Sequence, residues 1–252
     1  MKSTTDHFKH HAHVLFKRED LDGERLEGKI VVVLDVLFAT TTIIHALKSG
    51  ATEVIPTINE ESARAEAAKY EPHNCILAGE LYANTLPGFS HPSPLRLAQE
   101  SLEGKKVIYS TTNGTVALKQ SVGAEQIYVG ALINAEAVVN HILDHHREKQ
   151  LLIVCSGSMG NPNIEDICGA GYFIKLIKSK LQGDKPGFYS DAGECALSFF
   201  NSEPSHSLLL RSRVGQLMVA RNMTDEVRFA ANLSTHALVP QVNDGIVSVV
   251  GW

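Results

Sequence analysis

Cysteine is scarce in this chain, and no two cysteines lie close together in the sequence. The 252 residues contain 4 cysteines and no Cys-x-x-Cys pair. This spacing excludes both a zinc module and the disulfide framework of a small secreted domain. A chain of this length buries a sizeable core and does not need disulfide bonds for its stability. We therefore expect a protein of the reducing cytoplasm, and any role of Cys168 beyond packing stays open.

Long apolar runs and a surplus of basic residues are also missing. No apolar stretch is long enough for a signal peptide or a membrane helix. The formal net charge of -5 leaves no broad basic surface for nucleic acid. No P-loop occurs and no Gly-x-Gly-x-x-Gly segment follows a strand, so nucleotide binding is not indicated. We expect a small-molecule partner, no nucleic acid and no membrane, and a homo-oligomer stays open.

Four of the 12 histidines, His7, His10, His11 and His13, crowd near the start of the chain. They could form a metal-binding tract, but scattered histidines without carboxylate or cysteine neighbours seldom make a metal site. We favour a polar, frayed start that leads into a first strand.

What the chain does contain is an alternation of Val- and Ile-rich runs with helix-length segments, which is typical of α/β proteins. The expected strands cover residues 14–16, 30–37, 53–57, 75–79, 106–110, 126–130, 151–156 and 245–250. The expected helices cover residues 42–49, 60–70, 115–122, 135–147, 165–182, 191–201, 205–220 and 224–231. The run 30–37 is almost continuously apolar, which predicts a central strand covered on both faces. No long linker divides the chain, so we expect a single domain over residues 1–252.

A unit of strand, hydroxyl-rich turn and helix recurs along the chain. TTIIHALKSGA at 41–51 returns as TTNGTVALKQSVGA at 111–124, and a third strand at 151–156 leads through a Gly- and Asn-rich turn into a helix. Such turns present backbone N–H groups and the positive end of a helix dipole to anions. Thr and Asn at these places also simply cap helices. Both interpretations stay open, and the repeat predicts an internal pseudo-duplication.

Carboxylates follow several of the expected strands. Asp35 interrupts the most apolar strand, where a charge is costly unless it is paired, hydrogen-bonded or bound to a metal. Glu80 ends the segment CILAGE, and Asp166 follows the third turn. Open α/β sheets bind ligands at strand ends, and Mg²⁺ bridges carboxylates to phosphate oxygens. The pattern therefore indicates magnesium-assisted phosphoryl chemistry.

Other carboxylates near helix starts have a structural explanation. We favour Glu165 and Asp191 as helix caps, whereas the roles of Asp166 and Glu194 stay open.

A serine hydrolase is the competing interpretation. Ser158 in SGSMG follows a strand and precedes a helix, with His206 and His236 as candidate bases. The nucleophile elbow, however, requires Gly two residues before the serine, where this chain has Ser156. We do not favour this alternative.

Five segments in order along the chain resemble the 2-phosphosulfolactate phosphatases, magnesium-dependent enzymes of sulfolactate and coenzyme M synthesis. The segments are DVLFATTTIIHAL, GELYANTLPGF, STTNGTVAL, VCSGSMGNPNIEDICGAG and SDAGECAL. The resemblance runs from Ala12 to Asp244. It implies a three-layer α/β/α fold with a mixed central sheet and an internal pseudo-duplication, and a cytoplasmic phosphoric monoester hydrolase.

The resemblance also implies roles for individual residues. Asp35, Glu80 and Asp166 would be catalytic and would hold Mg²⁺. The residues expected to hold substrate oxygens are Thr40, Thr41, Thr42, Ser110, Thr111, Thr112, Asn113, Gly114, Thr115 and Arg213.

Three positions depart from the family pattern. Phe38 and Leu81 stand where the family has Arg, and Ser90 stands where it has Asp. We predict that these three positions share one pocket with less positive charge, for which Arg211 or Arg213 compensates. Two functions follow: a phosphatase for 2-phosphosulfolactate or a related phosphorylated small acid, and, as the alternative, a degenerate member that binds a phosphorylated or sulfonated acid without hydrolysing it.

Overall fold

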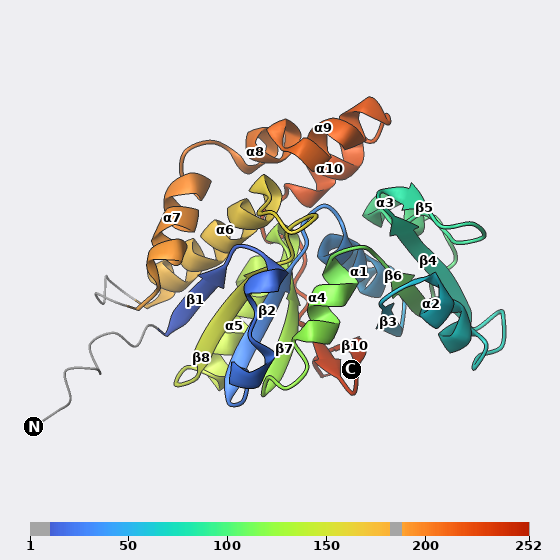
Figure 1. Ribbon diagram of the computed structural model, residues 1–252, viewed down its shortest axis with the longest axis horizontal. Coiled ribbons are helices and arrows are strands. Elements are labelled where there is room, and N and C mark those ends of the chain that lie inside the picture. The colour runs from blue at the N-terminus through green and yellow to red at the C-terminus, as the bar shows by residue number, and fades with distance from the viewer. Residues whose placement is uncertain (1–10, 182–187, 252) are drawn as a thin grey trace, which may run out of the picture.

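A ten-stranded mixed sheet organises the computed structural model, which describes residues 11–181 and 188–251 (Figure 1). The strand order is β1-β8-β2-β7-β9-β10-β3-β6-β4-β5. The strands are β1 (Ala12–Leu15), β2 (Lys29–Leu34), β3 (Glu53–Thr57), β4 (Cys75–Leu81), β5 (Asn84–Thr85), β6 (Lys106–Ser110), β7 (Gln126–Gly130), β8 (Gln150–Cys155), β9 (Pro240–Asn243) and β10 (Ile246–Val249). His7 and His10 of the histidine-rich start lie outside the described residues.

The sheet consists of two parallel groups of strands joined by a hairpin. In each group the middle strand, β2 between β8 and β7 or β6 between β3 and β4, has parallel neighbours on both sides. The antiparallel hairpin β9–β10 pairs with β7 on one side and with β3 on the other. β2 leads through α1 to β3 in the other group, and β6 leads through α4 back to β7. The two halves therefore share one connectivity, as the repeat predicted.

Helices cover the sheet in layers (Figure 1). α1 (Ala39–Lys48) and α4 (Gly114–Gln120) contribute Ile43, Leu47 and Leu118 to a core shared with strands of both groups. α5 (Ala135–His145) and α6 (Ile164–Lys180) pack on β7, β8 and β2, whereas α2 (Glu60–Ala67) packs on β3, β4 and β6. The predicted three-layer α/β/α fold is confirmed, and the apolar strand β2 lies inside the sheet.

Several boundaries differ from the sequence predictions. The expected helix 205–220 is two helices, α8 (Ser205–Arg211) and α9 (Arg213–Ala220), because Ser212 adopts an extended conformation and its Oγ accepts a hydrogen bond from Gly215 N at 2.9 Å. Asp191 does not cap α7 (Asp191–Phe200), since Ser190 does. The short elements β5, β9 and α3 (Pro94–Leu97) were not predicted, and α10 (Thr224–Ala230) follows α9.

No helix within residues 11–181 and 188–251 is long and apolar enough to cross a membrane.

A pair of histidines, one on α1 and one in the segment before β9, predicts a loss of stability in acid. His45 Nδ1 and His236 Nε2 lie 3.1 Å apart, and burial together with His236 lowers the pKa of His45 from 6.5 to about 4. As the pH falls from 6.5 towards 4, His45 binds a proton in the unfolded chain but stays neutral in the folded chain. The free energy of unfolding therefore decreases. We expect His45→Gln to reduce this decrease, measured by urea unfolding across that range. The exposed His206→Gln is the control, and an unchanged pH slope in His45→Gln would contradict the prediction.

Candidate active site

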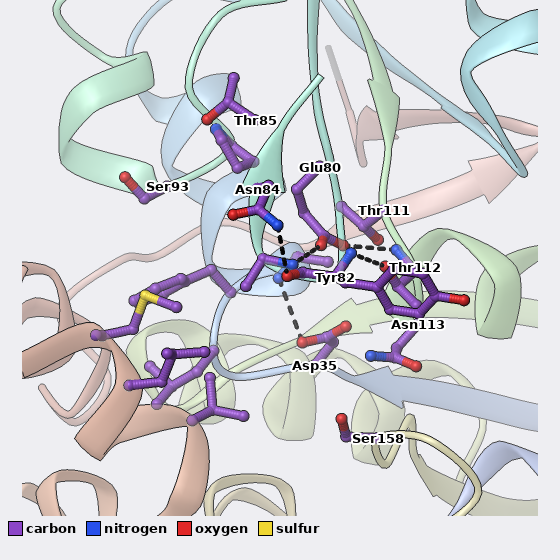
Figure 2. Close-up of a pocket in the computed structure, with 18 of the residues that line it drawn as sticks. Asp35, Glu80, Tyr82, Asn84, Thr85, Ser93, Thr111, Thr112, Asn113 and Ser158 are labelled. Atoms are coloured by element: carbon purple, nitrogen blue, oxygen red, sulfur yellow. Dashed lines mark hydrogen bonds between the residues drawn. The ribbon is translucent and has the colours of Figure 1, made fainter. Parts of the chain in front are cut away.

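A cavity of about 430 Å³ opens where the carboxyl ends of both parallel groups meet. Its lining comes from the ends of β2, β4 and β6, from the β4–β5 turn, from the 91–96 segment and from α9 (Figure 2). Asp35, Glu80, Thr111, Thr112 and Asn113 therefore lie on one wall, although they come from three strands. The structure thus brings together two of the three predicted carboxylates and the turn after β6, and Ser158 and Met159 of the turn after β8 line the same cavity.

Asp35 is a buried acid without a basic partner. It follows β2, is 7% exposed and accepts a hydrogen bond at 3.4 Å from Ala39 N. Burial is the main cause that raises its pKa to about 7, and the negative charges of Glu80 and Glu165 add to this effect. Among the described residues no Lys, Arg or His forms an ion pair with Asp35. A cation beside this carboxylate would relieve the repulsion, so the environment fits a metal ligand.

Glu80 lies at the end of β4 and ties two loops together. Its Oε1 accepts a hydrogen bond from Thr112 N and its Oε2 accepts one from Ala83 N, both at 2.6 Å. Thr112 Oγ1 in turn accepts a hydrogen bond from Tyr82 N at 3.2 Å (Figure 2). The carboxylate therefore fixes the β4–β5 turn against the turn that follows β6.

The 110–115 turn differs from the predicted cradle of free N–H groups. Thr111 N donates to Thr115 Oγ1 at 3.1 Å, and Thr115 N donates to Thr111 Oγ1 at 3.2 Å. With Thr112 N bonded to Glu80, three amides of this turn already have partners within the chain. Thr111, Thr112 and Asn113 line the cavity, whereas Ser110, Gly114 and Thr115 lie behind it. A substrate at this wall would meet side chains rather than a ring of free amides.

The threonines of the first turn form hydrogen bonds with the backbone. Thr40, Thr41 and Thr42 are buried and do not line the cavity. Their hydroxyls donate to the carbonyls of Asp35, Val36 and Pro92 at 2.9, 2.8 and 2.8 Å, respectively. In this structure the three hydroxyls thus bond the backbone, and their predicted contact with substrate oxygens stays a prediction.

Thr41→Val tests this structural role. The change removes the donor to Val36 O and leaves a buried carbonyl without this partner, so we expect a loss of about 1–3 kcal/mol in the free energy of unfolding. The Michaelis constant for a phosphorylated substrate should stay unchanged, because the hydroxyl does not face the cavity. Urea unfolding and steady-state kinetics measure the two effects. A raised Michaelis constant with unchanged stability would support the substrate-binding role instead.

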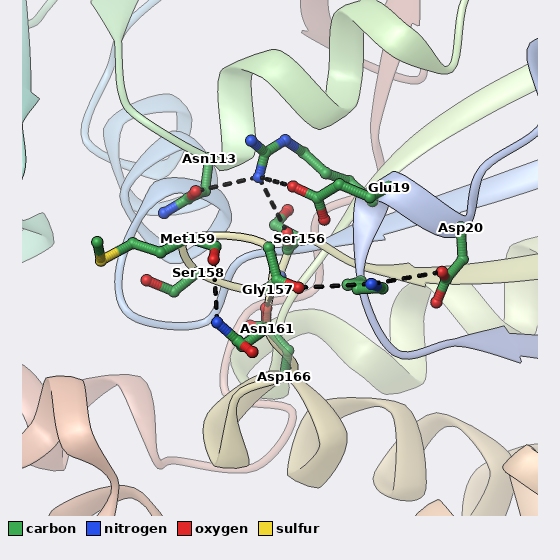
Figure 3. A network of polar contacts seen from close by, with 12 residues as sticks. Glu19, Asp20, Asn113, Ser156, Gly157, Ser158, Met159, Asn161 and Asp166 are labelled. Atoms are coloured by element: carbon green, nitrogen blue, oxygen red, sulfur yellow. Dashed lines mark hydrogen bonds and ion pairs between the residues drawn. The ribbon is translucent and has the colours of Figure 1, made fainter.

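Asp166 lies outside the cavity, although the resemblance makes it a metal ligand. It is fully buried at the start of α6, where its Oδ1 accepts from Val36 N at 2.9 Å and its Oδ2 accepts from Gly157 N at 3.1 Å (Figure 3). These bonds hold the segments after β2 and β8 together. In residues 11–181 and 188–251 no group of three or more His, Cys, Asp or Glu is arranged to hold a metal ion, so Asp35, Glu80 and Asp166 do not form one ligand set.

Glu165 does not cap α6 as predicted. The side chain is fully buried, and neither carboxylate oxygen has a hydrogen-bond partner among the described residues. Burial raises its pKa, while the nearby Arg213 acts in the opposite direction. Its charge acts on the site through Asp35, whose pKa it helps to raise.

Arg18 connects two of the three turns. Its Nη1 donates to Asn113 Oδ1 at 3.1 Å and to Ser156 O at 3.5 Å, and it pairs with Glu19 at 3.1 Å (Figure 3). Asn113 lines the cavity, so this half-buried arginine positions a polar side chain of the wall. No motif in the sequence indicated Arg18, which lies eleven positions before the first residue of β2.

Part of the cavity wall is basic. Arg96, Arg213 and Arg221 all line the cavity, and only Arg213 was predicted. Arg213 Nη2 donates to Ser158 Oγ at 2.7 Å, and Arg221 donates to Ala83 O and, at 3.3 Å, to Asn84 Oδ1. These cations come from α3, α9 and the residue after α9, so no single sequence motif contains them.

His91 completes the basic wall as a neutral imidazole. Burial, together with Arg96 and Arg221, lowers its pKa to about 4. Its Nδ1 lies 2.8 Å from Ser93 Oγ, which donates at 2.6 Å to the buried carboxylate of Glu226. The ring is therefore held in place by a chain of polar contacts. A histidine within the Pro- and Ser-rich segment 90–94 is the signal that could have indicated this residue.

Comparisons with known proteins identify the family of this chain. A sequence profile of 2-phosphosulpholactate phosphatase matches residues 15–245. The chain belongs to this family. It is 34% identical over 228 residues to the "Probable 2-phosphosulfolactate phosphatase" of Symbiobacterium thermophilum, covering 89% of this chain and 96% of that protein. It is 33% identical over 231 residues to the protein of the same name from Caldanaerobacter subterraneus, covering 90% and 93%.

The three positions that depart from the pattern of the phosphosulfolactate phosphatase family lie in different places in the structure. Phe38 lines the cavity, whereas Leu81 is 51% exposed and Ser90 hydrogen-bonds Glu100 outside it. The prediction that the three share one pocket is wrong for Leu81 and Ser90. Arg211 does not compensate there, because it pairs with Glu203 at 3.3 Å and does not line the cavity.

The serine hydrolase alternative finds no support in this site. Ser158 lines the cavity but accepts its hydrogen bond from Arg213. His236 lies beside His45 on α1, away from the cavity lining.

Proposed function

We propose that this chain is a magnesium-dependent phosphatase that hydrolyses 2-phosphosulfolactate or a related phosphorylated small acid. The observation that carries the proposal is the mixture of charges in the cavity. Two carboxylates, Asp35 and Glu80, line the same cavity as three cations, Arg96, Arg213 and Arg221. A substrate with several negative groups and a divalent cation together complement both kinds of charge.

Mg²⁺ would be held by Asp35 and Glu80, where it would neutralise phosphate charge and polarise the bond that breaks. Asp166 would not hold the metal directly, because it does not line the cavity, whereas Asp35 and Glu80 do. It positions the segment after β2 and therefore acts through Asp35. The arginines bind and orient the anionic groups of the substrate, and the neutral His91 offers a hydrogen bond without adding charge.

The experiment is a phosphate-release assay on purified protein with 2-phosphosulfolactate and 2-phospholactate. We expect release in the presence of Mg²⁺ and loss of release in EDTA, restored by added Mg²⁺. Full activity in a strong chelator would exclude a divalent ion. No release with Mg²⁺ from these two esters or from any other 2-phosphorylated hydroxy acid tested would contradict the phosphatase.

A degenerate binding protein is the second candidate, favoured by one observation. The amides of Thr112 and Ala83, which point towards the carboxylate wall, are bonded to Glu80 rather than left for a phosphate. Calorimetry separates the two candidates: a binder gives a measurable Kd for these esters, no phosphate release and no requirement for Mg²⁺.

A further inference from the structure

α9 presents a stripe of apolar side chains to the cavity, with a cation at each end. Val214, Leu217 and Met218 line the cavity and recur at the spacing of one helix face. Arg213 begins the helix and Arg221 follows it directly, which puts their backbones about 12 Å apart at 1.5 Å per residue. This wall therefore combines anion recognition at its ends with an apolar middle.

Further apolar side chains from other segments line the same cavity. Leu37 and Phe38 come from the loop after β2, and Met223 lies between α9 and α10. Near the same cavity Met159 is 69% exposed and Leu217 is 36% exposed. Single exposed apolar residues are ordinary, but several around one cavity mark a surface that binds an apolar group.

The size of the cavity points to the same conclusion. Its volume of about 430 Å³ lies within the roughly 300–1,000 Å³ that is typical of sites for drug-sized ligands. Phosphate, carboxylate and sulfonate groups gain nothing from an apolar wall, because they must give up hydration there. Phe38 and Val214 pack partly against the protein's own core, and a substrate made only of such groups would leave their remaining surface, and that of Leu217, without an apolar ligand group.

We propose that the preferred substrate is a phosphorylated 2-hydroxy acid whose side group is apolar, aryl or branched alkyl, and that this group packs between Phe38 and the α9 stripe. The phosphate and carboxylate then lie among Asp35, Glu80 and the arginines. This inference rests on the proposed phosphatase function and replaces the sulfonate with an apolar group. Phe38, in the place where the family has Arg, is the residue that determines the specificity.

The test compares three esters that share phosphate and carboxylate and differ only in the group on the third carbon: 2-phospholactate, 2-phosphosulfolactate and the 2-phosphate of 3-phenyllactate. We expect kcat/KM for the phenyl ester to be at least about tenfold higher than for either of the others. Calorimetry gives the Kd of the same three esters, so the preference is measured even for a protein that binds without turnover.

Three variants locate the apolar subsite. Phe38→Arg should lower kcat/KM for the phenyl ester about tenfold and raise it for the sulfonate ester. Leu217→Gln, on an exposed helix position, should lower the preference for the phenyl ester without a new charge. Leu81→Arg restores the other family arginine outside the cavity, so it should leave the three ratios unchanged.

The outcomes separate this inference from the proposed function. If all three esters are hydrolysed and bound equally, or if the sulfonate ester is preferred, the apolar subsite is wrong and the phosphatase stands. If no ester releases phosphate but the phenyl ester binds at least about tenfold tighter, the phosphatase is wrong and the subsite stands. If Phe38→Arg and Leu81→Arg change the ratios equally, Phe38 does not determine the specificity.

Discussion

Asp35→Asn is expected to lower kcat/KM for the phosphorylated substrate by about a thousandfold or more, while the folded protein becomes no less stable. The carboxylate is the buried ligand that the proposed cation needs, and Asn keeps the shape but loses the charge. In the folded chain without metal, that charge is repelled by Glu80 and Glu165 and disfavoured by burial, which raises the pKa of Asp35 to about 7. Neutralising it therefore removes an unfavourable interaction at pH 8.

Two measurements test the Asp35→Asn prediction. Phosphate release gives the activity, and thermal unfolding with and without Mg²⁺ gives both the stability and the stabilisation by metal. We expect the rise in Tm with Mg²⁺ to disappear in the variant. The control is Asp225→Asn on the exposed side of α10, which should keep both the activity and the rise in Tm with Mg²⁺. An Asp35→Asn protein that still hydrolyses its substrate or is still stabilised by Mg²⁺ would contradict Asp35 as a metal ligand.

Gly114→Ala is expected to have the second-largest effect, because the first residue of α4 touches the first turn of α1. A Cβ atom at this position would lie 2.4 Å from Ala39 Cβ and 2.7 Å from Asp35 Oδ2. Such distances force the two helix starts apart, at a cost of about 1–3 kcal/mol in the free energy of unfolding. The same shift moves Asp35 relative to Glu80, and displacement of about 1 Å at a reacting site costs about a hundredfold in rate.

Gly23→Ala is the matched control, since a Cβ there meets nothing within 4 Å. Urea unfolding measures the stability of both variants, and steady-state kinetics measure their kcat/KM. If the two variants have equal stability and equal activity, the starts of α4 and α1 can move apart without cost, and the prediction is wrong.

The sequence by itself predicted the α/β class, because apolar runs that are covered on both faces leave a strong local pattern. β3, β6 and β7 have the predicted bounds, and the two repeated strand–turn–helix units occupy equivalent places in the sheet. Boundaries set by side-chain caps were less predictable. Ser212 breaks the expected helix 205–220 through one hydrogen bond to Gly215 N, which helical periodicity does not reveal.

For the site, sequence patterns were informative about residues at strand ends and uninformative about the basic residues of the lining. Asp35 and Glu80 end strands, so they were found. His91 and Arg96 reach the cavity from the 91–96 segment and Arg221 from the end of α9, and nothing local in the sequence relates these two segments to each other. Asp166 and the threonines 40–42 carry the expected residue types, yet backbone groups engage their polar atoms.

The sequence alone therefore determined the secondary structure, the repeat and the family pattern, because these depend on residue order and on the periodicity of burial. Only the tertiary structure decided which polar atoms face the cavity. Two oppositely directed groups of strands meet at their carboxyl ends, and α9 covers that meeting point with cations and an apolar stripe. Whether a hydroxyl or carboxylate binds substrate depends on which backbone groups lie within hydrogen-bond distance, and that is fixed by packing between segments that are far apart in the chain.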